Sequence, residues 1–72
     1  MQEDINKINN CLNLALITAQ QLQAKVMEEE GDSELYRKIS SYLVPNLRHW
    51  INGAQVGNIK DLNELIERNA KK

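Results

Sequence analysis

The first thirty residues carry an unbroken heptad pattern of apolar side chains. Apolar residues recur in alternating steps of three and four, which places them on one stripe of an α-helix. The stripe consists of Ile5, Ile8, Leu12, Ala15, Ala19, Leu22 and Val26. The pattern predicts a straight helix over residues 3–30, roughly 40 Å long, that packs lengthwise against another helix.

A chain of 72 residues forms a single domain with a thin core, because a domain of this size buries only about 60% of the surface that its unfolded form exposes. Small scaffolds gain stability from disulfides, a structural metal or a partner chain. Cys11 is the only cysteine and His49 the only histidine, which excludes an intrachain disulfide and a Cys/His metal cluster. We therefore expect residues 1–72 to associate with another chain.

The composition indicates an all-α protein. Leucine, isoleucine, alanine, glutamine and glutamate are frequent, phenylalanine is missing and there is one proline, which favours helices over strands. The sequence has no signal-peptide pattern and no long apolar run, so we expect a cytoplasmic protein outside the membrane. The formal net charge of -1 gives no general attraction to nucleic acid. A protein partner is expected rather than nucleic acid, a membrane or a small-molecule substrate.

Residues 31–33 interrupt the apolar pattern and predict a tight helical hairpin. Gly31 suits the position just past a helix end, and Asp32 or Ser33 can accept the free N–H groups of the next helix. The second helix is predicted over residues 33–52, with apolar residues again at helical spacing. Pro45 removes a backbone hydrogen bond within it, so we expect either a kink or a break near this residue.

A short third helix is predicted over residues 58–69. Residues 53–57 are bounded by two glycines and are interpreted as a connector, and Asn58 followed by Asp61 resembles a capping box. The polar end, residues 69–72, is expected to be disordered. The predicted fold is a long N-terminal helix in an antiparallel hairpin, a second helix kinked or broken near Pro45, and a short third helix.

The first helix carries more apolar surface than one stripe requires. Leu14 and Ile17 lie roughly opposite the stripe, and Cys11 and Leu16 extend an apolar belt between the two sides. A helix that is apolar most of the way round is usually covered on both sides. We do not expect the rest of so short a chain to cover both. The alternative is a centrally buried helix in a compact three-helix fold.

This surplus gives the candidate partner-binding residues, which are Leu14, Leu16, Ile17 and Trp50. Trp50 is either an anchor of the core or an interface hot spot. Cys11 is interpreted as a small buried hydrophobe and His49 as a half-exposed helix residue. Because no nucleophile, base and orienting group stand in a recognised spacing, we predict no catalytic residue, no metal ligand, no cofactor and no enzymatic activity.

A glycine–aspartate turn is followed by an apolar helix face, formed by Gly31, Asp32, Tyr36, Leu43, Leu47 and Trp50 or Ile51. This segment resembles the second helix of the small E-component co-chaperones of bacterial type III secretion needles, and the first helix has a similar length. The resemblance implies a cytoplasmic protein that binds a larger helical-repeat chaperone and helps to keep the needle subunit from polymerising early. Pro45 and the additional helix after Gly57 depart from that family's simple hairpin.

A second, partial pattern begins at the tryptophan and is carried by Trp50, Gly53, Asn58, Ile59, Leu62 and Leu65. Its spacing is similar to that of the C-terminal half of Cro and phage-repressor helix-turn-helix domains. The resemblance implies a recognition helix that ends near Trp50, with Asn46, Arg48 and His49 available for bases and phosphates. Upstream, Arg37, Ser40 and Pro45 depart from that pattern.

The sequence therefore predicts a non-catalytic helical interaction module, an adaptor or co-chaperone that holds a helical partner. A small helix-turn-helix DNA-binding regulator and a structural homodimer are the alternatives. Whether the partner is another protein or a second copy of the chain is left open by the sequence.

Overall fold

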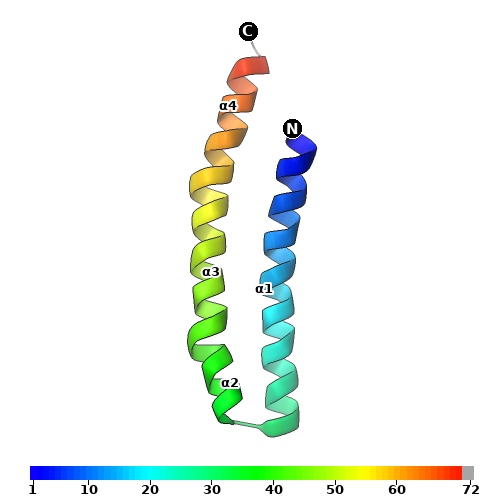
Figure 1. The fold of residues 1–72 in the computed structure, drawn as a ribbon, viewed down its shortest axis with the longest axis vertical. Coiled ribbons are helices and arrows are strands. Elements are labelled where there is room, and N and C mark those ends of the chain that lie inside the picture. Colours follow the sequence, from blue (N-terminus) through cyan, green and yellow to red (C-terminus); the bar gives the residue numbers. More distant parts are fainter. Residues whose placement is uncertain (71–72) are drawn as a thin grey trace.

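The computed structural model describes residues 1–70 and shows two long helices that run antiparallel as a hairpin (Figure 1). The first helix is α1 (Gln2–Glu30). The second helix is continuous and consists of α2 (Glu34–Lys38), the π-helical segment η1 (Ile39–Leu43), α3 (Val44–Asn52), the π-helical segment η2 (Gly53–Ile59) and α4 (Lys60–Ala70). The predicted all-α hairpin is confirmed, and so is its long first helix.

The predicted third helix is wrong, because residues 53–57 are helical and join α3 to α4 without a break. Gly53 has φ -59 and ψ -43, and Asn58 lies inside η2, where it caps nothing. Asn69 and Ala70, expected in a disordered tail, belong to α4. Lys71 and Lys72, the rest of that tail, lie outside the described residues.

The kink expected near Pro45 is present, and the helix does not break there. In Figure 1 the second helix changes direction between α2 and α3. The ring of Pro45 crowds the carbonyl of Ser41, four residues back, and its nitrogen donates no hydrogen bond. Directly before it, the N–H of Val44 donates to the carbonyl of Ile39, five residues back. This wider π turn accommodates the proline and bends the helix.

The two π segments also keep the apolar residues of the second helix directed at α1. Each π turn adds one residue to a turn, and in η2 the N–H of Lys60 donates to the carbonyl of Gln55. The residues that face α1 are separated alternately by eight and seven positions; they include Tyr36, Val44, Ile51, Ile59 and Ile66. A regular helix would turn this series away from α1, and the extra residue at each π segment brings it back.

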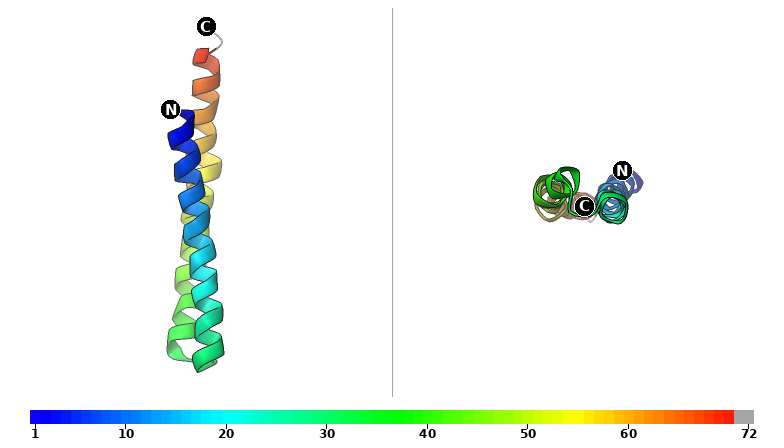
Figure 2. Two further views of the ribbon diagram at one scale, coloured as in Figure 1. Left: turned by 90° about the vertical axis from the view of Figure 1, so that its right-hand side faces the viewer. Right: turned by 90° about the horizontal axis from the view of Figure 1, so that it is seen from below.

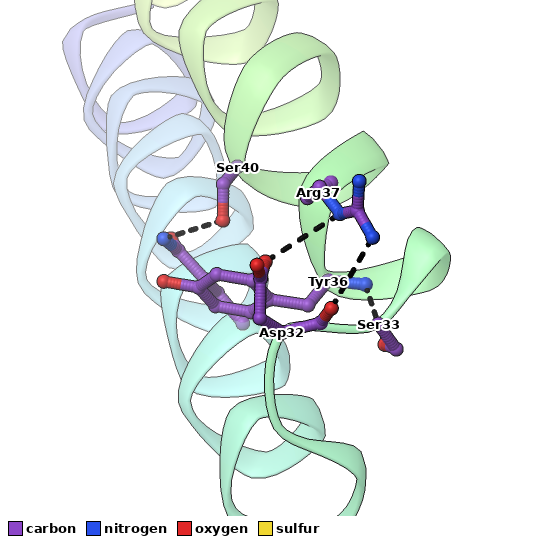
Figure 3. Close-up of polar contacts among 6 residues, drawn as sticks. Asp32, Ser33, Tyr36, Arg37 and Ser40 are labelled. Atoms are coloured by element: carbon purple, nitrogen blue, oxygen red, sulfur yellow. Dashed lines mark hydrogen bonds and ion pairs between the residues drawn. The ribbon is translucent and has the colours of Figure 1, made fainter.

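Residues 31–33 connect the two helices, and Figure 3 shows the polar contacts around this turn. Gly31 has φ 70, and its N–H donates to the carbonyl of Met27 at 2.9 Å. Ser33 caps α2, because its Oγ accepts from the backbone N–H of Tyr36 at 3.1 Å. Arg37 forms an exposed ion pair with Asp32 at 3.5 Å. The predicted turn is confirmed, and of the two predicted capping residues, Asp32 or Ser33, the structure shows Ser33.

A single seam between the two helices holds the core. Its buried cluster consists of Ala19, Val26, Ile39 and Val44, with Leu16, Tyr36 and Leu47 packed against it. Ile5 and Ile51 are buried further along the seam. On α1 every buried or half-buried residue belongs to one heptad series, which is Ile5, Asn9, Leu12, Leu16, Ala19, Gln23 and Val26.

This series corrects the predicted stripe at three of its seven positions. Ile8, Ala15 and Leu22 are exposed, and their places in the seam are taken by Asn9, Leu16 and Gln23. The side chain of Gln23 donates to Ser40 Oγ at 2.9 Å, so its amide has a hydrogen-bond partner across the seam. The apolar stripe of α1 is thus turned by about 50°, half of one residue step, away from the second helix.

The two helices form a single layer. The Cα atoms span 57 × 18 × 9 Å, and Figure 2 shows that no other part of residues 1–70 covers either broad side of the pair. The radius of gyration is 16.5 Å, whereas a compact chain of this length has about 11 Å. The compact three-helix alternative is therefore wrong. Within residues 1–70, neither helix has the length of apolar sequence that crossing a bilayer requires.

The turn supplies a stability test. Gly31→Ala places a Cβ on a backbone with positive φ, and we expect it to lower the free energy of unfolding by about 1–3 kcal/mol. Gly57→Ala is the control, because a Cβ there meets open space in a helical backbone; it is expected to raise the free energy of unfolding by about 0.5–1 kcal/mol. Urea denaturation curves of both variants, recorded at one fixed protein concentration, measure the two changes in unfolding free energy. Equal stability of Gly31→Ala and wild type would contradict the observed turn.

Candidate interaction surface

One broad side of the hairpin is lined by apolar residues that each directly precede a seam residue. On α1 they are Ile8, Ala15 and Leu22, and on the second helix they are Leu35, Leu43 and Trp50. In an antiparallel pair the second helix runs in the opposite direction to the first and faces it from the opposite side. These two reversals cancel, so the residues that directly precede the seam on either helix lie on the same broad side of the pair. We call this set of six residues the broad apolar face.

The register of the hairpin places Trp50 beside a small residue. Gln23 donates to Ser40 at 2.9 Å, and Gln55 donates to Asn13 at 2.8 Å. Trp50 lies between Ser40 and Gln55 on the second helix. On α1, Ala15 lies between their partners Gln23 and Asn13. Trp50 and Ala15 therefore lie at the same height along the hairpin. The side chain of Ala15 is too small to cover the indole ring, and Trp50 is 69% exposed.

Charged side chains are almost missing from the middle of the molecule. α1 carries no acidic or basic residue between Lys7 and Lys25, and the second helix carries only Arg48 and His49 between Lys38 and Lys60. Arg48 follows a seam residue and lies on the opposite side of the pair. The centre of the broad apolar face is therefore both apolar and uncharged, which is the composition of an interface core.

The opposite broad side is polar. Residues that follow the seam there include Asn6, Asn13, Gln20, Arg48 and Gln55, and an open groove on that side is lined by Gln20, Gln23, Ser40, Val44, Pro45, Arg48, His49 and Asn52. Its polar groups are amides, one hydroxyl, one guanidinium and one imidazole. This set has no nucleophile aligned with a base, and we assign no chemistry to it.

The four predicted binding residues do not come together. Trp50 lies on the broad apolar face, whereas Leu14 and Ile17 lie on the outer side of α1, away from the second helix, and are 62% and 49% exposed. Leu16 is half-buried and packs against the core cluster, so the structure places it in the seam. The exposure of Trp50 excludes its role as a core anchor within the hairpin.

Sequence reasoning missed Ile8, Leu22 and Leu43 as surface residues. Ile8 is 54% exposed, and the other two are also exposed. A signal was present in the second helix, where apolar pairs such as Leu43–Val44 and Trp50–Ile51 recur. The second member of each pair occupies the seam, and the first member has to lie beside it.

Cys11 and His49 are both exposed. The interpretation of Cys11 as a buried hydrophobe is therefore wrong, because the side of α1 that carries it is uncovered. His49 is more exposed than expected. Among residues 1–70 no cluster of histidine, cysteine, aspartate or glutamate is arranged to hold a metal ion.

Comparison with known proteins gave no match, whether to protein-family models, to curated proteins or to solved structures.

Two adjacent residues provide a test of the surface. Ile51 is 5% exposed and Trp50 is 69% exposed. Truncating each in turn therefore distinguishes the contribution of the seam to stability from that of the broad apolar face. Ile51→Ala is expected to lower the free energy of unfolding by about 2 kcal/mol or more. Trp50→Ala is expected to change it by less than about 0.5 kcal/mol when the chain is dilute enough to be monomeric. A large loss of monomer stability in Trp50→Ala would place the indole in the core.

Proposed function

We propose that this protein is a non-catalytic interaction module that holds a helical partner against its broad apolar face. The carrying observation is the exposed Trp50 at the centre of an uncharged apolar surface. Tryptophan is prominent among interface hot spots, and soluble monomers seldom leave contiguous apolar patches uncovered.

The total surface supports this proposal. The chain exposes 5722 Å², whereas a compact monomer of its mass exposes about 4,600 Å². The excess of roughly 1,100 Å² is comparable with the area that each partner buries in a standard protein–protein interface. A flat pair of helices is half of a two-layer arrangement, and a second pair of helices would complete it.

The biological setting that we propose is that of a cytoplasmic adaptor or co-chaperone. The long first helix, the Gly31–Asp32 turn and the second helix resemble the small E-component co-chaperones of type III secretion needles, and that resemblance suggests a helical-repeat chaperone as the larger partner. No feature of the geometry favours the helix-turn-helix alternative, since residues 53–57 are helical where that resemblance requires a loop.

The binding test compares two exposed aromatic residues of the second helix. Trp50→Glu introduces a charge at the centre of the broad apolar face and is expected to weaken partner binding about tenfold or more. Tyr42→Glu is the matched control, because Tyr42 is 64% exposed and lies on the outer side of the second helix. Co-expression of the tagged chain with the products of its adjacent genes, followed by gel filtration and titration of the complex, gives the measurement. Equal binding by Trp50→Glu and wild type would contradict the proposal.

The outer side of α1 is tested separately. Ile17→Glu is expected to lower association with a further protein while circular dichroism shows most of the helicity retained, because Ile17 is exposed and does not belong to the buried core. Gln21→Glu is the control, since Gln21 is a polar exposed residue one turn further along α1. Outright unfolding of Ile17→Glu would instead show that Ile17 belongs to the core.

A further inference from the structure

The orientation of α1 within the hairpin indicates two neighbours for this helix. Its most apolar stripe, which includes Ile8 and Leu22, is turned by about 50° from the second helix toward the broad apolar face. The seam meanwhile accepts Asn9 and Gln23, both half-buried. An α-helix whose apolar stripe points between two directions is typical of a four-helix bundle, where each helix packs against two others.

We infer that a second copy of this chain covers the broad apolar face and completes a four-helix bundle; the inference rests on the proposed function and names its partner. The whole broad side of the hairpin that carries this face measures 57 × 18 Å between Cα atoms, a footprint of about 1,000 Å². A standard interface buries about 800 Å² on each partner, so this side, with the broad apolar face at its centre, is large enough for a stable dimer. Two flat hairpins stacked face to face leave no broad apolar side open.

The charges of the helices select the arrangement of the two copies. α1 carries five acidic and two basic side chains, a net charge of -3, and the second helix carries four acidic and five basic ones, a net charge of +1. A two-fold axis along the length of the hairpin places each α1 on the second helix of the other copy. A two-fold axis across the hairpin places α1 on α1 and opposes like charges.

The lengthwise axis also matches large side chains with small ones. It keeps residues at the same level, so that Trp50 of one copy lies over the stretch of α1 that carries Cys11, Ala15 and Thr18 in the other copy. All three side chains are small, and they leave room for the indole ring. A crosswise axis at mid-length would instead bring the two Trp50 side chains together and leave the two Ala15 positions facing a gap.

Leu14 and Ile17 remain on the outside of this bundle. They lie on the side of α1 that faces away from the second helix, and the second copy approaches from the broad apolar face. The dimer therefore retains two copies of an exposed apolar site for a further protein. This separation makes the self-association independent of the Ile17 surface.

Sedimentation equilibrium of the pure chain is the first measurement, and a dimer is expected. Ala15→Arg is expected to weaken the dimer at least about tenfold, because the arginine replaces the small residue beneath Trp50. Gln21→Arg, on the outer side of α1, is expected to leave it unchanged. A dimer that tolerates Ala15→Arg would overturn the assignment of the face.

Spin-label distances determine the direction of the axis. Asp32→Cys in a Cys11→Ser background carries one nitroxide at each turn, and double electron–electron resonance measures the distance between the two labels. The lengthwise axis places both turns at the same end, with their backbones roughly 10 Å apart, one helix spacing, so a distance between the labels of no more than about 20 Å is expected. A distance near the 57 Å length of the hairpin would overturn the lengthwise arrangement.

Failure of the inference can be told apart from failure of the proposed function. One outcome is that the pure chain is monomeric at high concentration but binds a different helical protein, and that Trp50→Glu abolishes this binding. That outcome would overturn the second copy as occupant and leave the proposed function standing. If the chain is monomeric and Trp50→Glu alters its association with no other protein, both the inferred dimer and the proposed function are overturned.

Discussion

The contact of Ile39 and Val44 with Ala19 and Val26 holds the hairpin together, and the shape of the molecule follows from it. This contact is one row of side chains along one seam, so each helix covers only a narrow strip of the other. Within residues 1–70 no third helix covers the remaining strips. Both broad sides and both outer sides are therefore available to other molecules, and their chemistry differs: one broad side is apolar, and the other carries amides and Arg48.

The two helices stay in contact along their length because the second one is not a uniform α-helix. The seam of α1 repeats every seven residues, whereas the seam of the second helix alternates between eight and seven. Two regular helices with these periods would drift out of contact within a few turns. The wide turns at η1 and η2 absorb one residue each, and this correction keeps both Ile51 and Ile59 against α1.

Much of the fold could be predicted from local rules, and the failures have identifiable causes. The bounds of α1, the turn at Gly31 and the cap at Ser33 depend on residues near each other in sequence, so propensity and capping determine them. The glycines at 53 and 57 resemble a connector locally, but continuing the helix keeps Ile59 and Ile66 on the seam, and this tertiary contact decides the structure. The exposure of Trp50 was left open because a pattern of spacing does not state which side of a helix has a neighbour.

The misplaced stripe on α1 bears most directly on function. Periodicity identified the most apolar side of α1, and the error was to assume that this whole side meets the second helix. In the hairpin, only about half of this apolar side meets the second helix. Asn9 and Gln23 occupy the seam positions that Ile8 and Leu22 would otherwise fill. A helix on its own gains nothing from burying amides in preference to isoleucine and leucine. The observed rotation is favourable if Ile8 and Leu22 are buried elsewhere, against a surface that the isolated hairpin does not contain, and the exposed indole of Trp50 lies on that same side.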